Sequence, residues 1–225
     1  MPTSHPTPRY TQRRTFRYKG YDYRRPGAYF VTICASKGRS VFGQVQDGVM
    51  VRNALGDVAH QCWVALPDHF PYVRLDVSII MPNHMHGLLW LYPEPGEGSE
   101  TQGTAPGTDM IYHVRTTTDH VRTTTDGMED AERGQFGVRR FGAPLAGSLS
   151  TIIGSYKAAV TRTAHKAQLI SAPPLWHGRF WDRIVRNDAE LARIRAYIES
   201  NPARWQADQL HPQAPPNRFN RWDQA

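Results

Sequence analysis

Cysteine is scarce in this sequence of 225 residues, which contains only Cys34 and Cys62 against ten histidines. That scarcity excludes a disulfide-linked scaffold and a cysteine-rich zinc module, and it fits the reducing cytoplasm. Long apolar runs are missing as well, because the longest are short, as in 87–91, so we expect no transmembrane helix and no membrane partner. The basic N-terminal residues are followed by no apolar core, so we expect no secretory signal. These absences together predict a cytoplasmic protein.

Hydrophobic residues make up 40% of the chain and charged residues 21%, which suits one compact domain with a buried core. The net charge is +7, and residues 9–25 hold seven basic residues against one acidic residue, interleaved with five aromatic residues. Cations neutralise phosphates and aromatic rings stack on bases, so this arm is typical of nucleic-acid binding. The alternative is a solvated basic tail that only keeps the protein soluble. The phosphate contacts expected in the arm are Arg13, Arg14, Arg17, Lys19, Arg24 and Arg25.

Apolar periodicity predicts an α+β fold, in which an antiparallel sheet with a ferredoxin-like arrangement carries helices packed on it. The predicted order is strand, helix, two strands, a long loop, helix, strand and helix. We therefore expect a basic arm at 1–25, one domain at 26–205 that a flexible insert at 92–147 interrupts, and a loosely ordered tail at 206–225. The predicted strands are 28–34, 41–45, 73–81, 84–91 and 180–185, and the predicted helices are 53–66, one from 148 and one from 187.

The predicted insert contains an internal repeat. Its 56 residues hold nine of the 18 glycines, and the heptapeptide HVRTTTD occurs twice in tandem, at 113–119 and 120–126. One valine in seven residues is too little apolar surface for a coiled coil. A recent duplication in a tolerant loop explains the repeat better.

A pair of histidines follows a predicted turn at Pro82-Asn83. Side chains alternate along a strand, so His84 and His86 project from the same face, about 7 Å apart along the chain. Two imidazoles in this position can hold one divalent cation. A bare His-x-His pair is also common in proteins without a metal, so the spacing leaves both readings open.

The last predicted helix offers a second pair. Tyr197 and Asn201 are four residues apart, so they share one face of the helix. They can be a nucleophile and a metal-ligating amide one turn later, or else a packing residue and a helix C-cap before Pro202. The spacing alone does not decide between these roles.

Three blocks of the sequence resemble the single-tyrosine (Y1) HUH transposases of the IS200/IS605 type. They are GAYFVTICASKGRSVFG, MPNHMHGLLWL and LWHGRFWDRIVRNDAELARIRAYIESNP. The chain is most similar to the REP-associated tyrosine transposases within that family. The resemblance covers about residues 14–91 and 148–205 and leaves out the insert, and it implies the architecture of the HUH endonucleases.

The resemblance also implies a chemistry. His84 and His86 match the metal-binding histidines, Asn201 matches the third metal ligand, and Tyr197 matches the nucleophile. The implied activity is metal-dependent cleavage and rejoining of single-stranded DNA near a REP-like hairpin, through a 5′-phosphotyrosine intermediate. The implied cofactor is Mg²⁺ or Mn²⁺: two histidines favour Mn²⁺ in affinity, whereas cellular abundance favours Mg²⁺. Relatives act as monomers or as homodimers.

Other readings stay open at the level of sequence. Lys157 and Arg162 can contact phosphates or belong to a solvated helix face, and Tyr156 is a rival nucleophile within an apolar stripe. Trp176 and Trp181 can stack on bases, although core packing is the simpler role. The whole protein can instead be a non-catalytic binder of DNA or RNA hairpins, or a phosphodiesterase that uses water in place of a tyrosine.

Overall fold

The computed structural model describes residues 21–93, 147–171 and 174–220. The chain divides into two units, and all of these residues belong to the first, Met1–Pro95 with Pro144–Ala225. Most of the basic arm and nearly all of the insert predicted at 92–147, including its repeat, lie outside the described residues.

A four-stranded antiparallel sheet organises the described residues. Its strands follow the order β4-β5-β1-β6, with β1 at Gly27–Cys34, β4 at Val73–Ile80, β5 at His84–Leu91 and β6 at Trp181–Ile184. With helices α1 (Ala54–Val64) and α3 (Leu149–Lys166), the chain runs β1-α1-β4-β5-α3-β6, which is the ferredoxin-like order. The predicted α+β class with an antiparallel sheet is therefore confirmed.

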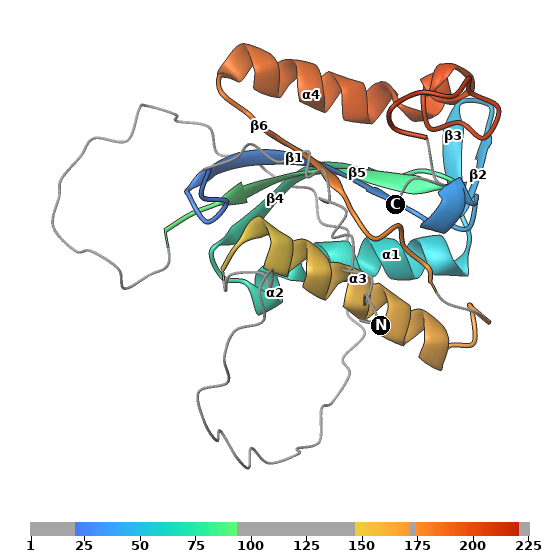
Figure 1. Cartoon of the computed structure of the whole chain (residues 1–225), viewed down its shortest axis with the longest axis horizontal. Coiled ribbons are helices and arrows are strands. Elements are labelled where there is room, and N and C mark those ends of the chain that lie inside the picture. The colour runs from blue at the N-terminus through green and yellow to red at the C-terminus, as the bar shows by residue number, and fades with distance from the viewer. Residues whose placement is uncertain (1–20, 94–146, 172–173, 221–225) are drawn as a thin grey trace, which may run out of the picture. The chain divides into compact units, whose positions relative to one another are not determined.

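The two faces of the sheet bury different helices (Figure 1). Met85 and Leu89 of β5 belong to the larger core cluster, together with residues of α1 and α3. Leu88 points to the opposite face, where it packs with Ile194 and Ile198 of α4 (Asp188–Ser200). Because side chains alternate along a strand, the even-numbered residues of β5, His84 and His86 included, face α4.

A hairpin outside the sheet was only half predicted. The sequence suggests one short strand at 41–45, whereas the structure has β2 (Gly43–Gln46) paired with β3 (Val49–Arg52). Asp47 and Gly48 connect them with φ of 50° and 74°. Positive φ at both central residues is the geometry of the two-residue turns that Asp-Gly favours.

Polar side chains fix where the longer helices begin. Asn53 accepts a hydrogen bond from the Gly56 amide at 2.9 Å, and Asn187 accepts one from the Glu190 amide at 2.9 Å, so both act as N-caps. The short helices are α2 (Leu66–His69), η1 (Ser36–Gly38) and η2 (Pro202–Ala207). Within the described ranges, no helix has both the length and the apolar character needed to cross a membrane.

Gly87 allows β5 to lie against α1. A Cβ atom on Gly87 would come within 2.3 Å of Trp63 Cζ2, a ring atom of a side chain that is 1% exposed. We expect Gly87→Ala to lower the free energy of unfolding by about 1–3 kcal/mol, because the ring has no space into which to move. Chemical denaturation measures the change. The matched control is Gly154→Ala in α3, where a Cβ meets nothing within 4 Å. Equal stability of the two variants would contradict this packing.

Candidate metal and tyrosine site

The two histidines of β5 are held deep beneath α4. His84 is 0% exposed and His86 is 2% exposed, and their Nε2 atoms lie 3.1 Å apart. Burial lowers the pKa of His84 to about 3 and lowers the pKa of His86 well below its usual value. Both rings are therefore neutral at pH 7, which is the form that binds a metal ion.

Each imidazole is oriented by a hydrogen bond at Nδ1, the ring nitrogen that does not face the other histidine. Nδ1 of His84 donates to Oδ1 of Asn83 at 2.8 Å, and Nδ1 of His86 bonds to Oγ1 of Thr32 at 2.9 Å. The amide of Asn83 is itself fixed, because its nitrogen donates to the carbonyls of Gly38 and Leu210. Such outer partners hold a ligating ring in position and leave Nε2 for the metal.

Helix α4 brings Tyr197 to this pair. The Tyr197 hydroxyl lies 3.2 Å from Nε2 of His86, although 111 residues separate the two in sequence. The ring meets Phe30 of β1 edge to face, with centroids 6.1 Å apart. Tyr197 is 40% exposed, so the residue lies at the border between the buried histidines and solvent. A substrate can therefore reach it.

The Tyr197 hydroxyl is protonated at neutral pH. Burial and the charge of Asp208 raise the pKa of Tyr197 to about 12, against the opposing effect of the Asn201 amide. A phenol in this state is a weak nucleophile until its proton leaves, so activation has to come from other groups in the site.

Asn201 closes α4 and is 2% exposed. Its Nδ2 donates to Oδ2 of Asp208 at 3.2 Å, whereas its Oδ1 has no hydrogen-bond partner within the described residues. A buried amide oxygen without a partner costs free energy, and a cation is one group that would satisfy it. The residues present therefore fit a divalent ion.

Asp208 is a member of the site that sequence reasoning missed. It follows η2, and its carboxylate lies with the ring nitrogens of His84 and His86 so that the three ligand atoms are all within 4.8 Å of one another. The sequence assigns this residue to the loosely ordered tail at 206–225. In the structure, 206–207 end η2 and 208–220 consist of turns and irregular segments, with Leu210 6% exposed. No periodic pattern in 206–220 marks Asp208.

An ion pair fixes α4 to the sheet close to Tyr197. The carboxylate of Asp76, at an irregularity of β4, accepts from Nε and Nη2 of Arg195 at 3.0 and 2.5 Å and from Nε1 of Trp90 at 3.1 Å. Burial on its own would raise the pKa of Asp76, but the hydrogen bonds from Arg195 and Trp90 outweigh it and lower the pKa. The depressed pKa means that this contribution to stability is present above the unfolded pKa and is lost as pH falls through the folded pKa.

We expect Arg195→Met to lower the free energy of unfolding at pH 7 by about 2 kcal/mol, below the 3–5 kcal/mol typical of a fully buried pair. The difference from wild type should begin to shrink as the pH is lowered below about 4, the usual carboxyl range, and should be lost only below the lower folded pKa, where Asp76 is protonated in both proteins. Urea titrations at several pH values measure it. Arg193→Met, at an exposed position of the same helix, is the control. A deficit that stays constant down to pH 2 would contradict the assignment to this pair.

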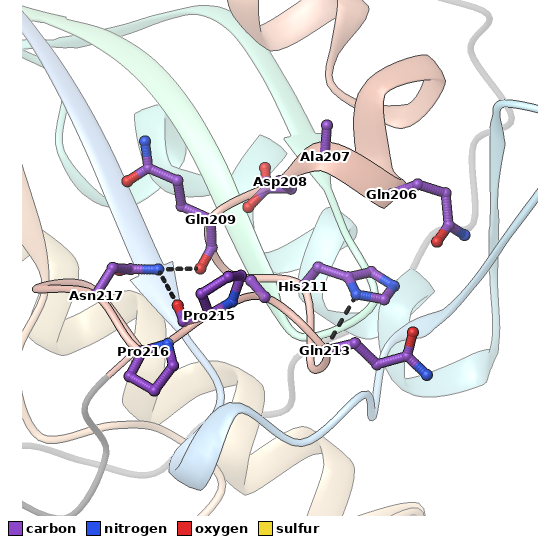
Figure 2. Close-up of a pocket in the computed structure, with 10 residues that line it drawn as sticks. Gln206, Ala207, Asp208, Gln209, His211, Gln213, Pro215, Pro216 and Asn217 are labelled. Carbon is purple, nitrogen blue, oxygen red and sulfur yellow. Dashed lines mark hydrogen bonds between the residues drawn. The ribbon is translucent and has the colours of Figure 1, made fainter.

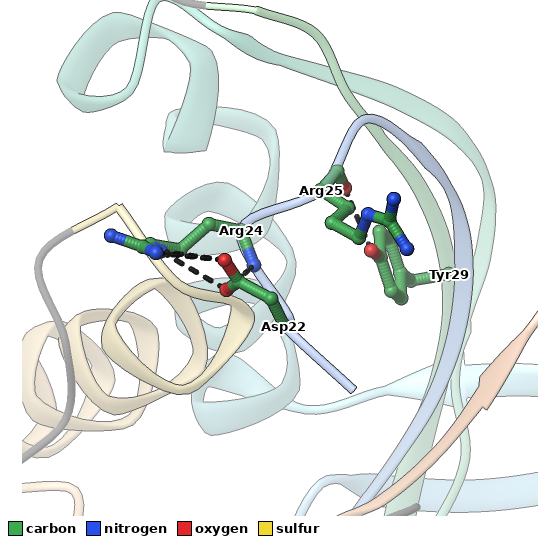
Figure 3. A network of polar contacts seen from close by, with 4 residues as sticks. All are labelled: Asp22, Arg24, Arg25 and Tyr29. Atoms are coloured by element: carbon green, nitrogen blue, oxygen red, sulfur yellow. Dashed lines mark hydrogen bonds and ion pairs between the residues drawn. The ribbon is translucent and has the colours of Figure 1, made fainter. Parts of the chain in front are cut away.

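The basic residues that the sequence predicts as phosphate contacts lie in several parts of the chain. Arg13, Arg14, Arg17 and Lys19 lie outside the described residues. Arg24 is described, and its guanidinium holds Asp22 in an ion pair at 2.7 Å and lowers the pKa of that carboxyl to about 2 (Figure 3). Arg25 is exposed, and its carbonyl accepts from the Tyr29 hydroxyl at 2.7 Å.

The basic residues of α3 do not join the histidines. The Lys157 ammonium donates to the carbonyls of His177 and Arg179 at 2.8 and 3.0 Å, and burial lowers the pKa of Lys157 to about 8. That lysine therefore supports a loop, and an external phosphate would have to compete with two carbonyls. Arg162 is exposed on α3, which packs on the other face of the sheet.

Two aromatic residues weighed from the sequence lie in the core. Tyr156 is 0% exposed, and its hydroxyl donates to the carbonyl of Ala59 at 3.2 Å, so no substrate reaches it. Trp176 is 8% exposed and packs on Phe42. Trp181 of β6 is only half-buried, and its ring stacks on His177 with an angle of 8° between the planes.

The fold and the site define a class of protein, in which a ferredoxin-like sheet carries two histidines beneath a helix that carries a tyrosine. Within it the chain belongs to the same family as a Haemophilus influenzae protein whose name states no function, and to which it is 30% identical over 199 residues. That alignment spans 88% of this chain and 93% of the relative. No family model matches the sequence.

Two solved structures are similar to this chain. One is a REP-associated tyrosine transposase bound to a REP hairpin, at 14% identity and a TM-score of 0.48, covering 88% of this chain and 77% of that one. The other is a candidate transposase from Deinococcus radiodurans, at 16% identity and a TM-score of 0.37, covering 82% of this chain and 96% of that one.

Proposed function

We propose that this protein is a metal-dependent endonuclease and strand transferase for single-stranded DNA, of the single-tyrosine HUH transposase type, that acts near DNA hairpins. The observation that carries the proposal is the 3.2 Å distance between the Tyr197 hydroxyl and Nε2 of His86. It joins the two motifs that the sequence resemblance pairs, and these motifs lie on different elements. The partly exposed tyrosine and the buried, neutral histidines suit a nucleophile beside a cation site.

The proposed reaction has the polarity that the sequence resemblance implies. The oxygen of Tyr197 attacks a phosphorus of the DNA backbone and loses its proton, while the bond from phosphorus to the 3′ oxygen breaks and that oxygen gains a proton. The products are a 5′-phosphotyrosine link and a free 3′-hydroxyl. A 3′-hydroxyl that later attacks the link restores the tyrosine and rejoins a strand, so no nucleotide cofactor is consumed.

His84, His86 and Asn201, with Asp208 beside them, would hold the Mg²⁺ or Mn²⁺ ion that the proposal requires. When bound there, a divalent ion polarises the phosphate and stabilises negative charge on its oxygens. The protein's own contribution is to keep both imidazoles neutral and oriented, through burial and through Asn83 and Thr32.

The test uses single-stranded oligonucleotides that carry hairpins from the DNA flanking the gene, labelled at the 5′ or the 3′ end and incubated with protein and Mn²⁺. We expect a protein–DNA adduct that survives denaturation and carries only the 3′ label. A cut strand without attached protein would identify a phosphodiesterase that uses water. Tight binding without cleavage under Mg²⁺ or Mn²⁺ would favour the non-catalytic hairpin binder.

A further inference from the structure

A cavity of about 460 Å³ adjoins the metal-ligand cluster. It is lined by the segment from Gln206 to Asn217 (Figure 2), and Asp208 belongs both to this lining and to the cluster with His84 and His86. A molecule bound in the cavity therefore lies beside Asp208, a member of that cluster. The volume is within the usual range for small-ligand sites.

The lining presents neutral hydrogen-bonding groups. The side-chain amides of Gln206, Gln209 and Gln213 make no hydrogen bond to the described part of the chain, and each offers both a donor and an acceptor. Nδ1 of His211 accepts from the Gln213 backbone amide at 3.2 Å, so its Nε2 carries a proton and is a further donor. In the view of Figure 2, the His211 ring lies to the right, as the side chains of Gln206 and Gln213 do.

Charge and shape narrow the class of ligand. The lining contains no lysine or arginine and one carboxylate, that of Asp208, so it does not favour a phosphate. Ala207, Ala214, Pro215 and Pro216 add flat apolar surface. A planar, neutral ring with donors and acceptors along its edge matches this lining, and a nucleobase is such a ring. Glutamine amides read base edges in protein–DNA complexes.

Hydrogen bonds hold the segment that lines the cavity in place. Nδ2 of Asn217 donates to the carbonyls of Gln209 and Pro215 at 2.9 and 3.1 Å and so closes the segment into a loop. Nδ2 of Asn83 donates to the carbonyl of Leu210 at 2.6 Å, and the same asparagine orients His84. The loop is thus tied to the strand that carries the histidines.

We propose that this cavity binds the base of a nucleotide next to the cleaved phosphate and reads its edge through Gln206 and Gln213. The proposal rests on the proposed function, because it takes its ligand from the same single-stranded DNA. It assigns part of the sequence preference to the C-terminal segment, in addition to any recognition of the hairpin.

The test is a binding selection that needs no cleavage. A hairpin oligonucleotide with randomised single-stranded flanks is retained on filters by Tyr197→Phe protein and sequenced. We expect a preference of about tenfold for one base at one flanking position. Adding Gln206→Ala or Gln213→Ala should abolish that preference, whereas Gln61→Ala, at an exposed position of α1, should keep it.

Absence of any base preference, or a preference that both cavity variants keep, would overturn the inference. So would its equal loss in Gln61→Ala. Adduct formation by the wild-type protein is scored separately. A base preference that depends on the cavity, without any adduct, would support the base site and contradict the cleavage function. An adduct without such a preference would support the cleavage function and contradict the base site.

Discussion

Tyr197→Phe should form no covalent DNA adduct, with a loss of at least about a thousandfold in the rate of adduct formation, as expected when a nucleophile is removed. The substitution deletes one oxygen and leaves the ring, so its edge contact with Phe30 and its packing on His86 remain. Hairpin binding should therefore stay within a few-fold of wild type. The loss would be specific to the chemical step.

Denaturing gels of labelled oligonucleotides measure the adduct, and binding is measured on the same oligonucleotides without denaturation. Tyr92→Phe is the matched control, because Tyr92 is 51% exposed and lies away from the histidines at the end of β5. An adduct that persists in Tyr197→Phe would contradict the assignment. Tyr156 would then be the next candidate, but its hydroxyl is buried against the Ala59 carbonyl, so it could act only after the core opens.

The sequence predicts those parts of the site that depend on local periodicity. His84 and His86 share a face because the backbone of any strand imposes a period of two, and Tyr197 and Asn201 share a face because four residues make about one helical turn. The same reasoning predicts that Met85 and Leu89 point away from the histidines, and both lie in the opposite core. Local patterns do not say that α4 packs on β5.

The parts of the site that depend on tertiary packing could not be predicted from the sequence. Asp208 joins the histidines only because η2 turns the chain back after Asn201, and Thr32 reaches His86 only through the register of β1 with β5. The position of Lys157 in the helical pattern predicts a solvent-exposed cation, yet its ammonium donates hydrogen bonds to two backbone carbonyls. The β2–β3 hairpin is different, because Asp47-Gly48 is a recognisable turn signal that the prediction did not use.

Loss of a histidine should remove metal binding and cleavage together. We expect His86→Ala to lower the affinity for Mn²⁺ by at least about a hundredfold, since even outer-shell changes cost ten- to a hundredfold. Calorimetric titration of EDTA-treated protein measures the affinity, and the adduct assay gives the activity. His69→Ala, at an exposed position of α2, should match wild type in both. Full cleavage by EDTA-treated protein would remove the metal from the proposed reaction.

The same titration tests whether Asn201 or Asp208 completes the site. Both carboxylate oxygens of Asp208 already accept hydrogen bonds, from the Leu210 amide at 2.6 Å and from Nδ2 of Asn201 at 3.2 Å. Oδ1 of Asn201 is buried without a partner among the described residues, so it is the more available ligand. We therefore expect Asn201→Ala to cost about a hundredfold in Mn²⁺ affinity and Asp208→Asn, which keeps an oxygen but loses the charge, about tenfold. The reverse order would make Asp208 the direct ligand and Asn201 the residue that orients it.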